Sequence, residues 1–137
     1  FYLGEIRKSP KILEKLKTPN ATQIQLLHQL KQITLDAVQS IAQGNFEEVG
    51  KLLDLSWNLK KRITPQATNV KIEAIYSQAL KAGALGGKVM GAGGGGCMFF
   101  ICPLDQRKNF IQEMEKNGLK EIDFGIDWQG LEVKCVL

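Results

Sequence analysis

A dense glycine cluster is the feature of this sequence whose residue types and spacing point most directly to chemistry. Eight of the 14 glycines lie between Gly83 and Gly96, and the last four of them, Gly93 to Gly96, are consecutive. Such a run costs conformational entropy on folding. It is useful where backbone N–H groups must converge on an anion with no side chain in the way. The cluster therefore predicts a phosphate-binding loop, and the alternative is a flexible hairpin tip.

The best-known phosphate motifs do not fit the cluster. A Walker A loop needs Ser or Thr after Gly-Lys, whereas Gly87-Lys88 is followed by Val89. The letters from Gly91 to Gly96 match G-x-G-x-x-G, but that fingerprint must open a helix and Cys97–Cys102 is typical of a strand. The protein-kinase signatures that would accompany a glycine loop between strands are missing. The predicted order is therefore strand, glycine loop, strand and helix.

The elements that must position this loop follow from the spacing of apolar residues. Helices are predicted over Ala21–Ala42, Phe46–Arg62, Val70–Ala82 and Asp105–Asn117. In the first, one buried stripe is expected, formed by Leu26, Leu27, Leu30, Ile33, Ala37, Val38 and Ile41. Strands are predicted over Lys88–Met90 and Cys97–Cys102, a hairpin over Ile122–Leu137, and the end of one more strand at Phe1–Leu3. The fold class is α+β, with helices packed on one face of a small, mainly antiparallel four-stranded sheet.

Composition excludes several classes of protein. The 137 residues, 44% hydrophobic and 23% charged, are typical of one globular domain. Neither a membrane-spanning run nor a secretion signal is recognised, and the start at Phe1 rather than Met suggests a fragment. The net charge of +4 lies in basic clusters without interleaved aromatic residues, so nucleic acid is not the expected partner. Three cysteines without a CxxC pair and a lone His28 predict no metal site, no disulfide and a cytoplasmic location.

The glycine cluster and its surroundings resemble a known family. The run from Lys88 to Gly96, followed by an apolar strand, is similar to the third motif of the GHMP kinase superfamily. The longer stretch from Ala82 resembles the D-glycero-D-manno-heptose 7-phosphate kinase branch, next to the fucokinases. Residues 2–13 and 53–61 resemble further segments of that branch. The resemblance covers residues 1–137 as the family's C-terminal, ferredoxin-like domain only.

This resemblance implies an ATP-dependent sugar-phosphate kinase that requires Mg²⁺. Its acceptor would be a heptose 7-phosphate, phosphorylated at the anomeric oxygen to supply surface polysaccharide precursors. The family's N-terminal ATP-binding domain, with its Pro-x-x-x-Gly-Leu-x-Ser-Ser loop, has no counterpart in this sequence. The chain alone is therefore expected to be inactive and to expose an apolar patch where that domain docks. The alternative is a non-catalytic metabolite-binding regulatory domain that uses the glycine loop as an anion site.

Site residues are predicted within the same frame. No catalytic residue and no metal ligand is expected in this chain. The loop that supports the ATP phosphates comprises Gly91, Ala92, Gly93, Gly94, Gly95 and Gly96. Substrate contacts are predicted for Arg7, Ser9, Trp57 and Lys88. The alternatives are an exposed helix start for Arg7 and Ser9, a core aromatic for Trp57 and a solvent-facing strand residue for Lys88.

Overall fold

A computed structural model of the chain describes residues 1–4 and 19–133. The elements, in chain order, are α2 (Ala21–Ala42), α3 (Phe46–Ile63), the 3₁₀ turn η2 (Pro65–Ala67), α4 (Val70–Lys81), β1 (Gly86–Val89), β2 (Met98–Ile101) and α5 (Arg107–Lys116). The α+β class is confirmed, and each predicted helix lies within a few residues of an observed one. Across the described residues, no helix is both long and apolar enough to cross a membrane.

Asparagine side chains fix where three of the helices begin. Asn20 accepts a hydrogen bond from the Gln23 backbone N–H, and the Gln23 side chain accepts one in return from the Asn20 N–H, so α2 starts with a capping box. Asn45 and Asn69 cap α3 and α4 in the same way from one side only. These local bonds satisfy backbone donors that have no partner inside the helix.

The sheet holds the glycine loop at one end. β1 and β2 pair antiparallel, with Gly86 opposite Ile101 and Val89 opposite Met98. Tyr2 adds isolated bridges to Cys97 and Lys120, which places the predicted N-terminal strand beside the sheet without extending it into a ladder. The described residues thus contain two strands, and the expected four-stranded sheet is not found among them.

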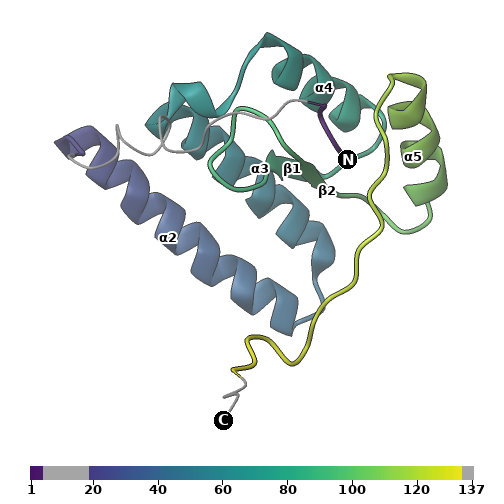
Figure 1. Cartoon of the computed structure of the whole chain (residues 1–137). Coiled ribbons are helices and arrows are strands. Elements are labelled where there is room, and N and C mark those ends of the chain that lie inside the picture. Colours follow the sequence, from purple (N-terminus) through teal and green to yellow (C-terminus); the bar gives the residue numbers. More distant parts are fainter. Residues whose placement is uncertain (5–18, 134–137) are drawn as a thin grey trace.

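The predicted C-terminal hairpin is the clearest departure from the sequence analysis. Residues 121–133 contain no strand, and residues 134–137 lie outside the described part of the chain. Phe124 is 68% exposed and Leu131 92% exposed, so neither face of the alternating pattern is buried. Period-two alternation favours a strand because one face packs against a neighbour. Without such a neighbour, the segment runs irregularly along the molecule (Figure 1).

The core lies where α3, α4, α5 and the two strands meet. Its largest fully buried side chains are Trp57, Ile72, Val89, Met98 and Met114. β1 approaches α3 closely: a Cβ on Gly86 would lie 2.0 Å from the Gly50 carbonyl oxygen. Only glycine permits this contact, so the strand that leads into the glycine loop lies directly on the α3 backbone.

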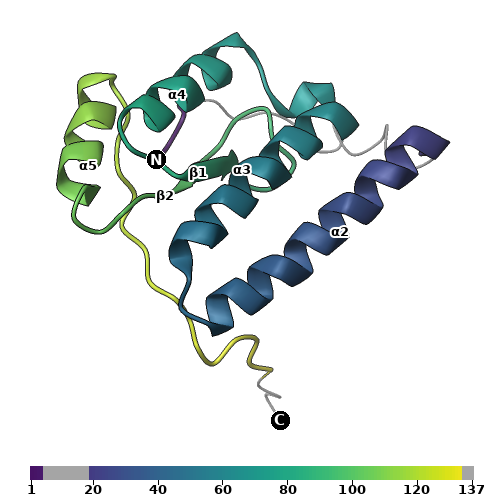
Figure 2. The ribbon, with the colours of Figure 1, turned by 180° about the vertical axis from the view of Figure 1, so that it is seen from behind.

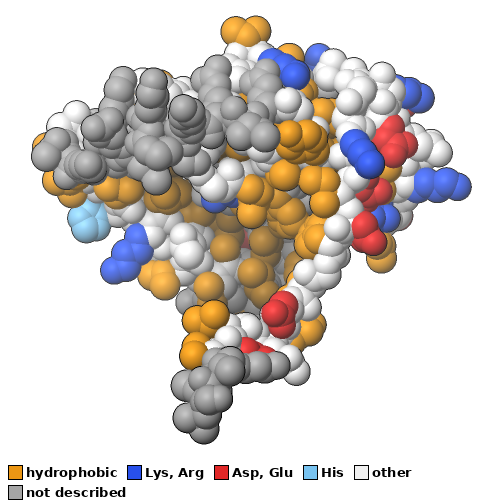
Figure 3. Space-filling model, viewed as in Figure 1, with side chains coloured by type: hydrophobic (Ala, Val, Ile, Leu, Met, Phe, Trp, Pro, Cys, Tyr) orange, Lys and Arg blue, Asp and Glu red, His pale blue; other side chains and the backbone are white. Residues whose placement is uncertain are grey.

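The α2 helix is less buried than its pattern predicts. It lies side by side with α3 in both ribbon views (Figures 1 and 2). Leu26 is buried, but Val38 is 60% exposed and Ile41 53% exposed, which corrects the expected single buried stripe. Hydrophobic side chains also gather in a hollow between the α2–α3 pair and the C-terminal segment (Figure 3).

Candidate functional site

The glycine loop connects the two strands and is closed at its base by backbone hydrogen bonds. The Met90 N–H donates to the Cys97 carbonyl at 2.8 Å, continuing the β1–β2 ladder by one more pair. The Gly96 carbonyl accepts a 2.8 Å hydrogen bond from the Leu3 N–H. The two ends of the loop are therefore held by backbone hydrogen bonds, and the six residues from Gly91 to Gly96 lie between them.

The 3₁₀ turn η2 supports the middle of the loop. The Gly94 N–H donates to the Ala67 carbonyl at 2.6 Å. At Gly93, which has a φ of +99°, a Cβ would lie 2.7 Å from the Ala67 Cβ and 2.8 Å from the Ala67 carbonyl oxygen. Both the backbone conformation and the contact require glycine here. The loop is thus packed against the protein and is not a free hairpin tip.

This packing uses part of the loop's backbone and leaves the rest without a partner. The Gly94 amide already has the Ala67 carbonyl as its acceptor, and Gly94 and Gly95 are buried. The amides of Gly91, Ala92 and Gly93 have no acceptor among the described residues. The Gly95 and Gly96 amides also have no acceptor among these residues, but Gly95 is buried. The three amides of the first half, Gly91 to Gly93, lie together next to β1, on the exposed and half-buried part of the loop.

Two lysines flank that first half. The Lys60 Nζ, on the last turns of α3, donates to the Gly91 carbonyl at 2.5 Å. Lys88, on β1, is half-buried. Burial, reinforced by the nearby positive charge of Lys88, lowers the pKa of Lys60 below its usual value. Lys60 is not among the site residues predicted from the sequence, because only the fold brings it to the loop, 31 residues away.

Behind the loop, a polar network fixes α4 and η2 relative to α3. Lys61 forms an ion pair with Glu73 at 2.9 Å, and Glu73 also accepts a hydrogen bond from the Thr68 hydroxyl at 2.6 Å. Thr68 follows Ala67, the residue whose carbonyl holds Gly94. The network therefore positions the support on which the loop rests.

A second network holds β1. The Tyr76 hydroxyl donates to an Asp54 carboxylate oxygen at 2.5 Å and accepts a hydrogen bond from the Gly87 N–H at 3.3 Å. Burial raises the pKa of Tyr76, and its hydrogen bond to the Asp54 carboxylate raises it further. Tyr76 therefore stays protonated and serves as a structural hydrogen-bond donor to α3.

Of the other residues predicted to contact the substrate, Trp57 lies in the core, and the remaining two lie outside the described residues. Trp57 is 0% exposed and packs beside Tyr76 with a ring-centroid distance of 6.3 Å, while the Lys61 Nζ lies 5.7 Å from the Trp57 ring centroid. A fully buried indole cannot stack on a sugar, so the predicted sugar contact is replaced by a core role. Arg7 and Ser9 lie within residues 5–18, outside the described part of the chain.

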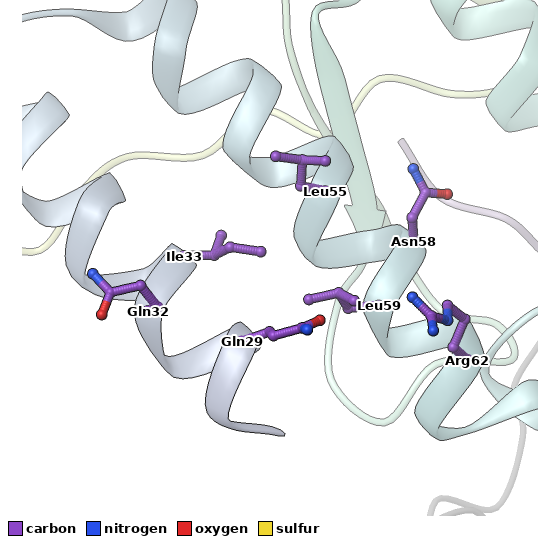
Figure 4. Close-up of a pocket in the computed structure, with 7 residues that line it drawn as sticks. All are labelled: Gln29, Gln32, Ile33, Leu55, Asn58, Leu59 and Arg62. Atoms are coloured by element: carbon purple, nitrogen blue, oxygen red, sulfur yellow. The ribbon is translucent and has the colours of Figure 1, made fainter. Parts of the chain in front are cut away.

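A groove that was not predicted from the sequence lies between α2 and α3. It has a volume of about 440 Å³ and is lined by Gln29, Gln32, Ile33, Leu55, Asn58, Leu59 and Arg62. Figure 4 shows the side chains of both helices along it, with Leu55 and Leu59 toward α2 and the Arg62 guanidinium at one end. Amides and a guanidinium can bind hydroxyl or phosphate groups. The only sequence signal for this groove was the basic character of Arg62, since glutamines on a helix are typical of a solvated face.

Comparisons with known proteins agree with the resemblance. The family model described as "GHMP kinases C terminal" matches residues 37–120. D-glycero-alpha-D-manno-heptose 7-phosphate kinase of Campylobacter jejuni is 29% identical over 135 residues, which is 96% of this chain and 40% of that protein. L-fucokinase/L-fucose-1-P guanylyltransferase of Bacteroides fragilis is 30% identical over 74% of this chain and 11% of that protein. The chain thus spans well under half of either relative.

A solved structure shares the fold. The mevalonate kinase of L. major, crystallised with R-mevalonate, superposes with a TM-score of 0.75 at 20% sequence identity. The match covers 84% of this chain and 36% of that one. At this identity, the match establishes the arrangement of helices and strands and carries no information on the substrate.

Proposed function

Since the chain belongs to the GHMP kinase family, whose C-terminal model matches residues 37–120, we propose that it is the C-terminal part of an ATP-dependent sugar-phosphate kinase. The proposed acceptor is a heptose 7-phosphate, phosphorylated at its anomeric oxygen. Similarity to the Campylobacter heptose 7-phosphate kinase over 96% of the chain supports this choice of acceptor. We place the protein in the cytoplasm, where activated sugars for surface polysaccharides would be prepared.

The observation that carries the proposal is the fixed glycine loop. Phosphoryl transfer depends mainly on positioning and on neutralising charge around the transferred group. The Ala67 carbonyl at Gly94 and Lys60 at Gly91 hold the loop in place through the chain's own contacts. Its first half would brace the ATP phosphates with backbone amides, and Lys88 would add a positive charge.

The active enzyme, in this proposal, pairs the chain with an N-terminal domain that carries the Pro-x-x-x-Gly-Leu-x-Ser-Ser loop. The chain spans 40% of the Campylobacter relative, which leaves room for such a domain in a protein of that length. Exposed apolar side chains such as Val38 and Ile41 on α2 and Trp128 in the C-terminal segment are consistent with a surface covered by another domain. By itself, the chain is proposed to be inactive.

ATP would be the phosphoryl donor and would bring Mg²⁺ bound to its phosphates. In the described residues, no three His, Cys, Asp or Glu side chains gather in a way that could hold a metal ion. The proposal therefore assigns no Mg²⁺ ligand to this part of the chain. Arg7 and Ser9 remain proposed contacts to the sugar phosphate.

A turnover assay on the full-length protein tests the proposal. With ATP and Mg²⁺, we expect product from heptose 7-phosphate and much less from fucose, galactose or mevalonate. Turnover of fucose or galactose alone would keep the kinase assignment and overturn the heptose acceptor. Absence of turnover with every acceptor, together with tight metabolite binding by the 137-residue chain without ATP, would favour the regulatory domain instead.

The loop itself is tested by a matched pair of substitutions. Gly93→Ala places a Cβ 2.7 Å from the Ala67 Cβ, so it must displace the loop, and we expect kcat/KM to fall by about 100-fold or more. Gly91→Ala also has a positive φ, +69°, but meets no atom within 4 Å, so it adds only a backbone strain of about 1–2 kcal/mol. Thermal unfolding of both variants controls for loss of fold. Equal activity of the two variants would show that the packing of Gly93 against Ala67 does not matter for turnover.

A further inference from the structure

The Lys60 side chain has more donors than the loop uses. Its Nζ carries three N–H groups, of which the structure shows one bonded, to the Gly91 carbonyl. The side chain is half-buried, so its remaining donors are only partly accessible to water. An anion that reaches a lysine in this setting stabilises its charged form through a charge-assisted hydrogen bond.

Lys88 lies on the same side of the sheet as α3. Side chains alternate along a strand, so Lys88 shares a face with Gly86, two residues earlier. That face is turned toward α3, because a Cβ on Gly86 would meet the Gly50 carbonyl oxygen and the Asp54 backbone. From there, β1 leads directly to Gly91, which Lys60 contacts. The positive charge of Lys88 is therefore close enough to repel that of Lys60, and this repulsion adds to the effect of burial in lowering the pKa of Lys60.

Neither lysine forms an ion pair within the described residues, unlike other lysines of α3. Lys51 pairs with Glu47 at 2.8 Å and Lys61 pairs with Glu73 at 2.9 Å. Two half-buried cations that repel each other raise the free energy of the folded state. An anion placed between them would offset that cost, and two positive charges match a phosphate dianion.

We propose that Lys60 and Lys88, together with the first half of the glycine loop, form a two-lysine subsite for a phosphate group, in which Lys60 also positions the loop through Gly91. The inference rests on the proposed function, because it assumes that the loop faces phosphoryl groups. The phosphate can belong to ATP or to the sugar phosphate, and the subsite chemistry is the same for both. Lys60 is thus a residue with two roles: it holds the loop and neutralises ligand charge.

Steady-state kinetics of the full-length protein separate the two sources of phosphate. We expect Lys88→Met to raise the KM for either ATP or the sugar phosphate by about tenfold, the size expected for one lost charge-assisted contact. Lys60→Met should raise the same KM and also lower kcat, and Lys60→Arg should restore part of both. Raising the salt concentration should weaken binding in the wild type more than in Lys88→Met, because the contact is electrostatic. The control is Lys51→Met, on the same helix and away from the loop.

Two outcomes would overturn the inference separately from the proposed function. If Lys60→Met and Lys88→Met leave both KM values within twofold while Gly93→Ala abolishes turnover, the two-lysine subsite is wrong and the kinase proposal stands. If the wild type turns over no acceptor, the kinase proposal fails, and pyrophosphate titration by calorimetry then decides on the subsite. Saturable pyrophosphate binding lost in both lysine variants would support it, and absence of binding to the wild type would overturn it.

Discussion

The glycine loop and the C-terminal segment of residues 121–133 are both irregular, yet they are held very differently. The loop has almost no side chains, but hydrogen bonds from Gly94 to Ala67 and from Lys60 to Gly91 connect it to the helical layer. The C-terminal segment is rich in large apolar side chains, and most of them are exposed. Its contacts to the rest of the molecule include the Arg107–Glu121 ion pair at 2.7 Å and the edge-on packing of Phe124 against Phe99.

The difference shows that long-range contacts, and not apolar content, decide which segment is fixed. A backbone loop can be rigid if its carbonyl and amide groups have specific partners. An apolar segment without a surface to cover gains little from its side chains. The loop is thus held by contacts within this chain, whereas the exposed apolar side chains of the C-terminal segment could still pack against another domain.

The largest effect on the free energy of unfolding is expected at Trp57, and Trp128 serves as its comparison. Trp57 is 0% exposed and belongs to the core behind the loop, so Trp57→Ala should destabilise the protein by about 3–5 kcal/mol. Trp128 is 86% exposed in the C-terminal segment, so Trp128→Ala should change the free energy of unfolding of the same chain by less than about 0.5 kcal/mol. Urea unfolding measures both. A large effect of Trp128→Ala would show that the segment is held as firmly as the loop.

An intermediate effect on the free energy of unfolding is expected at Tyr76, whose hydroxyl bonds the Gly87 amide of β1. Tyr76→Phe removes the hydroxyl that bonds Asp54 and Gly87, leaving the carboxylate and the amide each without one partner, at a cost of about 1–3 kcal/mol. Tyr2→Phe, at a side chain 41% exposed, serves as the control and should have little effect. Hydrogen exchange at β1 and the loop should increase in Tyr76→Phe alone. Unchanged exchange would mean that Tyr76 does not support the loop.

The smallest effect on the free energy of unfolding is expected when Glu73 is protonated at acid pH. Burial alone would raise the pKa of Glu73, but the hydrogen bonds from Thr68 and Lys61 and the Lys61 charge together lower it. A carboxyl group with a lowered folded-state pKa stabilises the fold above its unfolded pKa, and this contribution disappears as the pH falls through the folded-state value.

Glu73→Gln should therefore be less stable than the wild type near neutral pH, and the two should converge on acidification below the usual glutamate range. Urea midpoints measured across that range test this, with the solvent-facing Glu115→Gln as control. A difference between Glu73→Gln and the wild type that stays constant with pH would mean that the charge on Glu73 does not hold η2.

Much of this molecule could be predicted from its residues one segment at a time. The four helices could be predicted because the spacing of apolar residues along each of them is a local pattern. The glycine loop could be located, and its likeness to the GHMP kinases recognised, because its pattern is continuous in the sequence. The burial of Trp57, by contrast, could not be separated from a binding role by helical spacing alone, since an aromatic residue at such a position is compatible with either.

The helices, the two strands and the glycine loop between them were thus accessible from the residues alone, since each depends on contacts within a short stretch of chain. The packed fold was needed to show that Lys60 reaches Gly91 across 31 residues and that the Gly94 amide donates to the Ala67 carbonyl. It also decided that the alternating residues of 122–133 find no partner strand in the described chain. The physical reason is common to all three. Whether a side chain or an amide finds a partner depends on how distant segments pack together, and no local pattern of residues encodes that packing.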